Sequence, residues 1–124
     1  IENRSYQYLY KENEGYHFMH TDNYEQIFIE SHMIELPQFL KEGIICTIIF
    51  HAEEEMPLLV EQPQFLSTEV TYTEPGIKGD TATNTMKPAT IDTGAEVKVP
   101  LFIDTGDTIK IDIQKGIYVE RIKS

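Results

Sequence analysis

Short runs rich in β-branched and aromatic residues, many alternating between apolar and polar positions, are the feature that most constrains the fold of this chain. A run of this kind bounded by turn residues indicates a β-strand. Stretches rich in glycine, asparagine, aspartate or proline separate the runs. The runs occupy residues 7–10, 16–20, 24–29, 44–50, 57–60, 65–72, 89–91, 96–103, 108–113 and 117–122. The chain is therefore predicted to be all-β.

One stretch has a different character. Ser31 suits the N-cap of a helix from His32 to Lys41, and Gly43 suits its C-terminal end. Pro37 lies inside this stretch, which predicts a short, broken helix. Three strands, a short helix and two strands follow the order of a five-stranded OB-type barrel. We therefore predict two tandem small OB-type five-stranded β-barrels, with one short helix in the first.

Charge is distributed unevenly along the chain. Residues 61–64 are polar and contain a proline, so we place a domain boundary there, giving domains 1–63 and 64–124. The first holds 12 acidic and 3 basic side chains and the second 9 and 7, for a net charge of -11. Nucleic-acid affinity comes largely from lysine and arginine. Any contact with RNA is thus expected from the second domain.

Several classes of protein are disfavoured by what the sequence lacks. The single cysteine, Cys46, lies in a β-branched run, which predicts a buried thiol and fits the reducing cytoplasm. No apolar run is long enough to span a bilayer, so no membrane partner is expected. The chain begins at Ile1 with no signal-like segment, and we expect it to be a fragment or a processed form.

Neither a metal or cofactor site nor an enzyme is expected. His17 and His20 are three apart, which on a strand places them on opposite faces. Residues 53–55 are three glutamates without the spaced oxygen ligands of a calcium loop. No serine lies in a nucleophile-elbow motif, and Gly76-x-x-Gly79 is not followed by the residues of a P-loop.

The polar stretch from Pro75 to Thr85 is the strongest candidate for a functional loop, because long loops in small domains are often functional. Its glycines, Gly76 and Gly79, allow the backbone to come close to a partner, and Lys78 and Lys87 at its edges suit phosphate oxygens. The residues alone leave two readings of Asp80 and Thr81 open. These side chains could bond the local backbone in a turn or contact the edges of bases.

The second half carries an extended motif. The pattern Lys87-x-Ala89-x-x-x-x-Gly94-x-x-Val97-x-Val99-Pro100-x-x-Ile103-x-x-Gly106 resembles the C-terminal signature of bacterial translation elongation factor P, and Gly79-Asp80-Thr81 resembles a tripeptide that this family carries just before it. The resemblance extends from Tyr8-Leu9-Tyr10 to Gly116-Ile117-Tyr118-Val119, essentially the whole chain. Residues 53–55 depart from the family, which usually has a glycine-containing turn there, so any contact made by that turn is in doubt.

The resemblance implies the second and third domains of that family. The family binds the ribosome between the peptidyl and exit tRNA sites and promotes peptide-bond formation at stalled proline stretches. Gly79, Asp80 and Thr81 would lie beside the exit-site mRNA, and Tyr118 and Arg121 near the small subunit and the peptidyl-site tRNA. From the residues alone, Tyr118 could equally be a barrel aromatic and Arg121 a solvated strand end. The family's first domain, with its often modified lysine, has no counterpart here. We therefore expect a monomer that binds ribosomes weakly and does not stimulate the reaction.

Two alternatives remain open from the residues themselves. A tandem OB module that binds single-stranded RNA would need a basic groove lined by aromatic residues, which the acidic first domain disfavours. A protein-interaction module could instead use the acidic face of residues 1–63. On the ribosome that face could meet a basic ribosomal protein or mimic the charge of tRNA.

Overall fold

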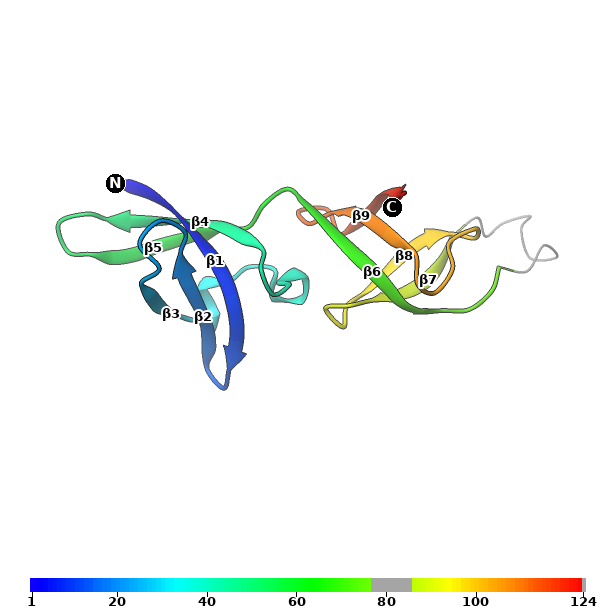
Figure 1. Cartoon of the computed structure of the whole chain (residues 1–124), viewed down its shortest axis with the longest axis horizontal. Helices are drawn as coiled ribbons and strands as arrows, with labels where there is room; N and C mark the ends of the chain where they lie inside the picture. Colours follow the sequence, from blue (N-terminus) through cyan, green and yellow to red (C-terminus); the bar gives the residue numbers. More distant parts are fainter. Residues whose placement is uncertain (77–85, 124) are drawn as a thin grey trace. The chain divides into compact units, whose positions relative to one another are not determined.

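The computed structural model of the chain describes residues 1–76 and 86–123. They form two compact units, Ile1–Pro63 and Gln64–Ser124. Each unit is a curled antiparallel sheet of five strands (Figure 1). The all-β class predicted from the sequence is confirmed.

The first unit is built around a long central strand. Its strands are β1 (Glu2–Glu12), β2 (Gly15–His20), β3 (Gln26–Glu30), β4 (Ile45–His51) and β5 (Met56–Glu61), in the sheet order β3-β2-β1-β4-β5. Strand β1 is longer than predicted, because its first residues pair with β4, from Glu2 opposite Phe50 to Gln7 opposite Ile45. Residues 2–5 have little β propensity of their own, so long-range pairing makes them a strand.

The core of this unit comes from alternating positions on the strands. Phe18 on β2 and Ile48 on β4 are completely buried, and Tyr8 packs its ring near those of Tyr16 and Phe18. The register of β1 against β2 shifts between Tyr8 and Tyr10. This bulge turns Tyr8 inward, where it is 8% exposed, and Tyr10 outward, where it is 51% exposed.

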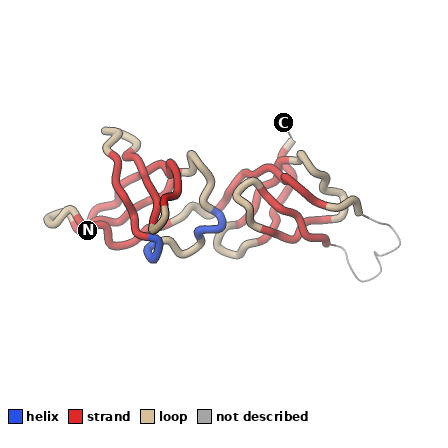
Figure 2. The backbone as a smooth tube through the Cα atoms, turned by 90° about the horizontal axis from the view of Figure 1, so that it is seen from below, coloured by secondary structure: helices blue, strands red, loops and turns tan. Residues whose placement is uncertain are grey.

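The predicted helix from His32 to Lys41 is replaced by two separate 3-10 turns, η1 (Ser31–Met33) and η2 (Pro37–Phe39), drawn in blue in Figure 2. Proline lacks an N–H and excludes the helical conformation from the residue before it, here Leu36. The Gln62 side chain satisfies the backbone of Leu36, accepting from its N–H at 2.9 Å and donating to its carbonyl at 2.8 Å. Ser31 makes no side-chain cap, because it is the first residue of η1.

The second unit contains β6 (Phe65–Thr73), β7 (Met86–Ile91), β8 (Glu96–Pro100), β9 (Thr108–Asp112) and β10 (Ile117–Ile122), in the sheet order β10-β9-β6-β7-β8. Strand β7 begins at Met86, three residues earlier than predicted. Strand β8 ends at Pro100 rather than at residue 103, and Ile103 N–H closes a turn onto the Pro100 carbonyl at 3.2 Å. The core residues include Val70, Ile91, Val99, Ile103, Ile109, Ile111 and Ile113.

Candidate functional site

The two ends of the segment that joins β6 to β7 are fixed by the side chain of Lys87. This lysine is 7% exposed, and its Nζ donates a hydrogen bond to the backbone carbonyl of Glu74. Beside it, the Thr73 hydroxyl donates to the Pro88 carbonyl at 2.9 Å. Lys87 therefore ties the end of β6 to the start of β7, with its aliphatic stem buried and its ammonium on the backbone.

Gly76, the last described residue before the gap, lies against the turn that follows β8. A Cβ added at Gly76 would come within 2.6 Å of the Leu101 carbonyl oxygen. Only glycine allows so close an approach of two backbones. The sequence predicted that this glycine would let the backbone approach a partner, and within the described residues that neighbour is Leu101 of the same chain.

A hollow of about 510 Å³ opens beside this anchored base. On its floor, Pro88 pairs with Lys98 and Thr90 with Glu96 across β7 and β8. Cationic, anionic and apolar side chains thus line one surface. The described residues that line it are Tyr72, Glu74, Pro75, Gly76, Met86, Lys87, Pro88, Thr90, Glu96, Lys98 and Leu101.

Tyr118 and Arg121 on β10 face the same side of the sheet. Residues three apart on a regular strand point to opposite faces, but the register of β10 shifts between Tyr118 and Glu120. Tyr118 consequently pairs with Ile111 and Arg121 with Ile109, two positions of one face of β9. The bulge turns two side chains that the sequence spacing would separate toward the same face.

The guanidinium of Arg121 lies over the ring of Phe102, with Cζ 5.5 Å from the ring centroid. Phe102 is 59% exposed and directly follows Leu101, which lines the hollow beside Lys87. Arg121 also borders a shallow depression that Asp107, Thr108 and Lys123 line. The turn after β8 therefore connects the surroundings of Lys87 with those of Arg121.

The predicted site residues are thus only partly described. Lys87, Tyr118 and Arg121 are placed as above, whereas Lys78, Gly79, Asp80 and Thr81 lie outside the described residues. Phe102 is a further exposed residue of this surface that the sequence pattern did not indicate, because it lies in the predicted strand 96–103. An available signal was Pro100, two residues before Phe102, since proline is rare inside a strand and suggests that the strand ends there.

The hairpin tip between β4 and β5 is held by an ion pair. Arg4 donates from both terminal nitrogens to Glu55, at 3.0 and 2.8 Å, and from one to Glu2 at 2.9 Å. Its guanidinium also covers the ring of Phe50, 4.3 Å from the centroid. The hydrogen bonds from Arg4 lower the pKa values of Glu55 and Glu2 below the usual range. One of the three glutamates at residues 53–55 is therefore a structural partner.

Burial raises the pKa of the Cys46 thiol to about 12, so this thiol is inert at neutral pH. Within residues 1–76 and 86–123, no three histidine, cysteine, aspartate or glutamate side chains group closely enough to hold a metal ion. In the same part of the chain no helix is long and apolar enough to cross a membrane.

Comparison with known proteins supplies the family. The profile described as "Elongation factor P (EF-P) OB domain" matches residues 1–60, and the one described as "Elongation factor P, C-terminal" matches residues 66–121. The chain belongs to the elongation factor P family. This confirms the resemblance seen in the sequence.

Similarity to individual members of the elongation factor P family extends over the entire chain. The chain is 53% identical over 124 residues to "Elongation factor P 1" of Porphyromonas gingivalis and 50% identical over 124 residues to "Elongation factor P" of Christiangramia forsetii. It is also 49% identical over 124 residues to "Elongation factor P" of Bacteroides fragilis. In each case all of this chain is aligned, and it spans 66% of the length of the relative.

In this elongation factor P family member, the site forms one connected surface of the second unit. The anchored base around Lys87, the mixed hollow and the Arg121–Phe102 pair are joined through Leu101. Such a surface offers cations for phosphate oxygens and exposed rings for flat partners.

Proposed function

We propose that this chain acts in translation elongation by binding the ribosome between the peptidyl and exit tRNA sites. There, together with the family's first domain, it takes part in promoting peptide-bond formation at stalled proline stretches. The chemistry is performed by the ribosome, and the chain contributes by positioning the peptidyl-tRNA for attack. It works as a monomer in the cytoplasm.

The observation that carries this proposal is the match of both structural units to elongation factor P. The two profiles together cover residues 1–60 and 66–121, and the identity to relatives is near 50% along the whole chain. Family membership supports a role in translation elongation, while the ribosomal position and the proline-dependent step extend that role.

The second unit provides the RNA contacts in this proposal. Gly79, Asp80 and Thr81 meet the exit-site mRNA, with Lys78 near a phosphate. Lys87, whose Nζ is bonded to the Glu74 carbonyl, adds positive charge to the RNA contact in this proposal.

Tyr118 and Arg121 contact the small-subunit RNA and the peptidyl-site tRNA. Their common face, produced by the bulge in β10, supports a joint contact. Phe102 under the guanidinium restricts where Arg121 can reach, which reduces the entropy lost on binding.

The first unit has a different partner. Its 12 acidic side chains against 3 basic ones disfavour contact with phosphates. We propose that this unit faces a basic ribosomal protein.

Binding to ribosomes that carry a peptidyl-site tRNA and an empty exit site tests the proposal. We expect saturable binding of the 124-residue chain, weakened by alanine at residues 79–81 and by Arg121→Ala. Lys115→Ala is the matched control, because Lys115 is an exposed cation in the turn between β9 and β10. Absence of saturable binding, or equal binding by all variants, would refute the proposed contacts.

A further inference from the structure

The outer face of β1, β2 and β3 in the first unit carries a row of three aromatic rings. Tyr10 pairs with His17 across β1 and β2, and His17 with Phe28 across β2 and β3. The Tyr10 and His17 rings stack at 4.5 Å, and the His17 and Phe28 rings meet edge to face at 5.2 Å. Tyr10 is 51% and Phe28 45% exposed, so the row presents open ring surface to solvent.

Two other rows flank the aromatic row, and they differ in charge. On one side the strand register aligns two carboxylates across a glycine, and on the other it aligns two amides across a thioether. The acidic row is Glu12, Gly15 and Glu30, and the neutral row is Gln7, Met19 and Gln26. The aromatic row thus has acidic side chains along one edge.

The packing of Phe28 depends on the glycine of the acidic row. A Cβ at Gly15 would lie 2.6 Å from the Phe28 ring and 2.3 Å from the Ile29 carbonyl oxygen. The ring edge of Phe28 therefore lies against Gly15, which the register pairs with Glu12 on one side and Glu30 on the other. Glycine here places an aromatic ring beside the acidic row.

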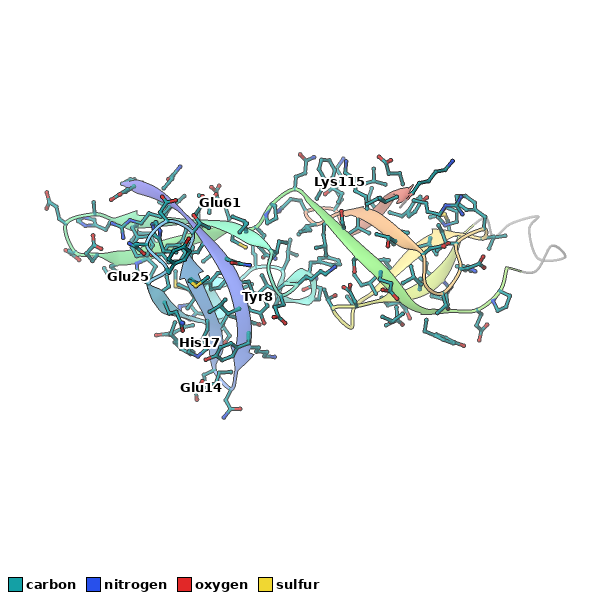
Figure 3. The ribbon with its side chains drawn as sticks, in the orientation of Figure 1. Tyr8, Glu14, His17, Glu25, Glu61 and Lys115 are labelled. Carbon is teal, nitrogen blue, oxygen red and sulfur yellow. The ribbon has the colours of Figure 1, made fainter. Side chains whose placement is uncertain are left out.

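A hollow continues from Phe28 at the end of the row. The tip of the β1–β2 hairpin and η1 form its two sides, joined by the Ser31 N–H donating to the Glu14 carbonyl at 3.0 Å. Figure 3 shows Glu14 and His17 at the same end of the first unit. The residues lining the hollow are Asn13, Glu14, Phe28, Glu30, Ser31 and His32.

The negative charge beside the aromatic row favours a cationic ligand. None of the described residues in the three rows or the hollow is lysine or arginine, and the nearest cation along β1, Lys11, pairs with the inward-facing Tyr16. The carboxylates of Glu12 and Glu30 lie near His17 Nε2 at 3.1 Å and His32 Nδ1 at 3.4 Å. With no lysine or arginine beside these carboxylates, the surface disfavours phosphates. A guanidinium, by contrast, stacks on aromatic faces and donates two hydrogen bonds to a carboxylate.

We propose that this face, the aromatic row with its acidic edge and the adjoining hollow, binds an arginine side chain of a basic protein segment. The guanidinium stacks on Phe28 and donates to the carboxylates of Glu30 and Glu14, while Tyr10 and His17 extend the platform for a neighbouring residue. This proposal depends on the proposed function only in taking the basic segment to belong to a ribosomal protein. Its chemistry is tested without ribosomes.

The test is a titration of the 124-residue chain with the peptide acetyl-Gly-Arg-Gly-Arg-Gly-amide, followed by backbone amide NMR at low salt. We expect saturable shifts confined to residues of the three rows and the hollow. Phe28→Ala is expected to raise the dissociation constant about two- to fivefold, which corresponds to the loss of one exposed cation–π contact. Phe65→Ala, which removes an exposed ring from the second unit outside its candidate site, leaves it unchanged.

A charge-matched pair separates local contact from general attraction to an acidic chain. The double variant Glu14→Gln/Glu30→Gln is expected to weaken binding more than Glu53→Gln/Glu54→Gln, which removes equal charge at the β4–β5 tip. If Phe28→Ala does not give the dispersed NMR spectrum of a folded protein, the comparison of the two double variants still tests the proposal.

Three results would overturn the inference: no saturable shifts, equal weakening by the two charge pairs, or stronger shifts of the same residues with decauridylate, which would indicate a nucleic-acid platform. Each leaves the ribosome-binding test of the proposed function to be judged separately.

Discussion

Replacing Lys87 with methionine isolates one hydrogen bond at the base of the β6–β7 connection. Methionine keeps the unbranched apolar stem that packs in the second unit but removes the ammonium that donates to the Glu74 carbonyl. Hydrogen bonds of charged groups contribute about 1.5–3 kcal/mol, so Lys87→Met should lower the free energy of unfolding by that amount. For a domain of this size the midpoint of thermal unfolding falls by roughly 6–24 °C.

Calorimetry of the whole chain measures this loss. Lys98→Met is the matched control, because Lys98 lies exposed on the neighbouring strand β8, opposite Pro88. Surface substitutions of this kind change stability by less than about 0.5 kcal/mol. Equal midpoints for the two variants would refute the anchoring role of Lys87.

Three further outcomes follow from other contacts. Thr68→Val should cost about 1 kcal/mol by chemical denaturation, because the buried Thr68 hydroxyl donates to Asp92 Oδ1; unchanged stability would contradict it. Arg4→Gln should return the pKa of Glu55 toward its usual range in an NMR titration. Since the native pKa is lowered, the stability from this pair is present above the usual pKa and lost as the pH falls through the native value, so wild type and variant should converge in acid. Cys46, with its pKa raised to about 12 and 1% exposure, should react with a thiol reagent only after unfolding, and rapid labelling of the native chain would contradict its burial.

Alternation and turn residues predicted most of the strands, because these patterns are local. The first residues of β1 were not predicted as strand, because Glu2 and Arg4 become strand residues only through pairing with β4. The break expected at Pro37 is present, but two 3-10 turns take the place of an α-helix for a reason that the sequence already contained. Pro37 divides the segment, and tertiary hydrogen bonds from Gln62 satisfy the backbone that a helix would have satisfied itself.

The candidate site shows the same limit. Lys87 was singled out as a possible phosphate ligand from its position at a loop edge, but its bond to the Glu74 carbonyl depends on a neighbour thirteen residues away. The shared face of Tyr118 and Arg121 requires a bulge in β10 that could not be predicted from the residues of that strand. The aromatic row of Tyr10, His17 and Phe28 needs the cross-strand register, which a single sequence does not supply.

The position of the chain on the ribosome is the central claim, and electron cryo-microscopy of the complex tests it most directly. The specimen is the 124-residue chain bound to ribosomes with a peptidyl-site tRNA and an empty exit site. We predict density for the chain between the peptidyl and exit sites, with residues 79–81 at the exit-site mRNA and Arg121 at RNA. Density elsewhere on the ribosome, or the second unit turned away from the mRNA, would contradict the account.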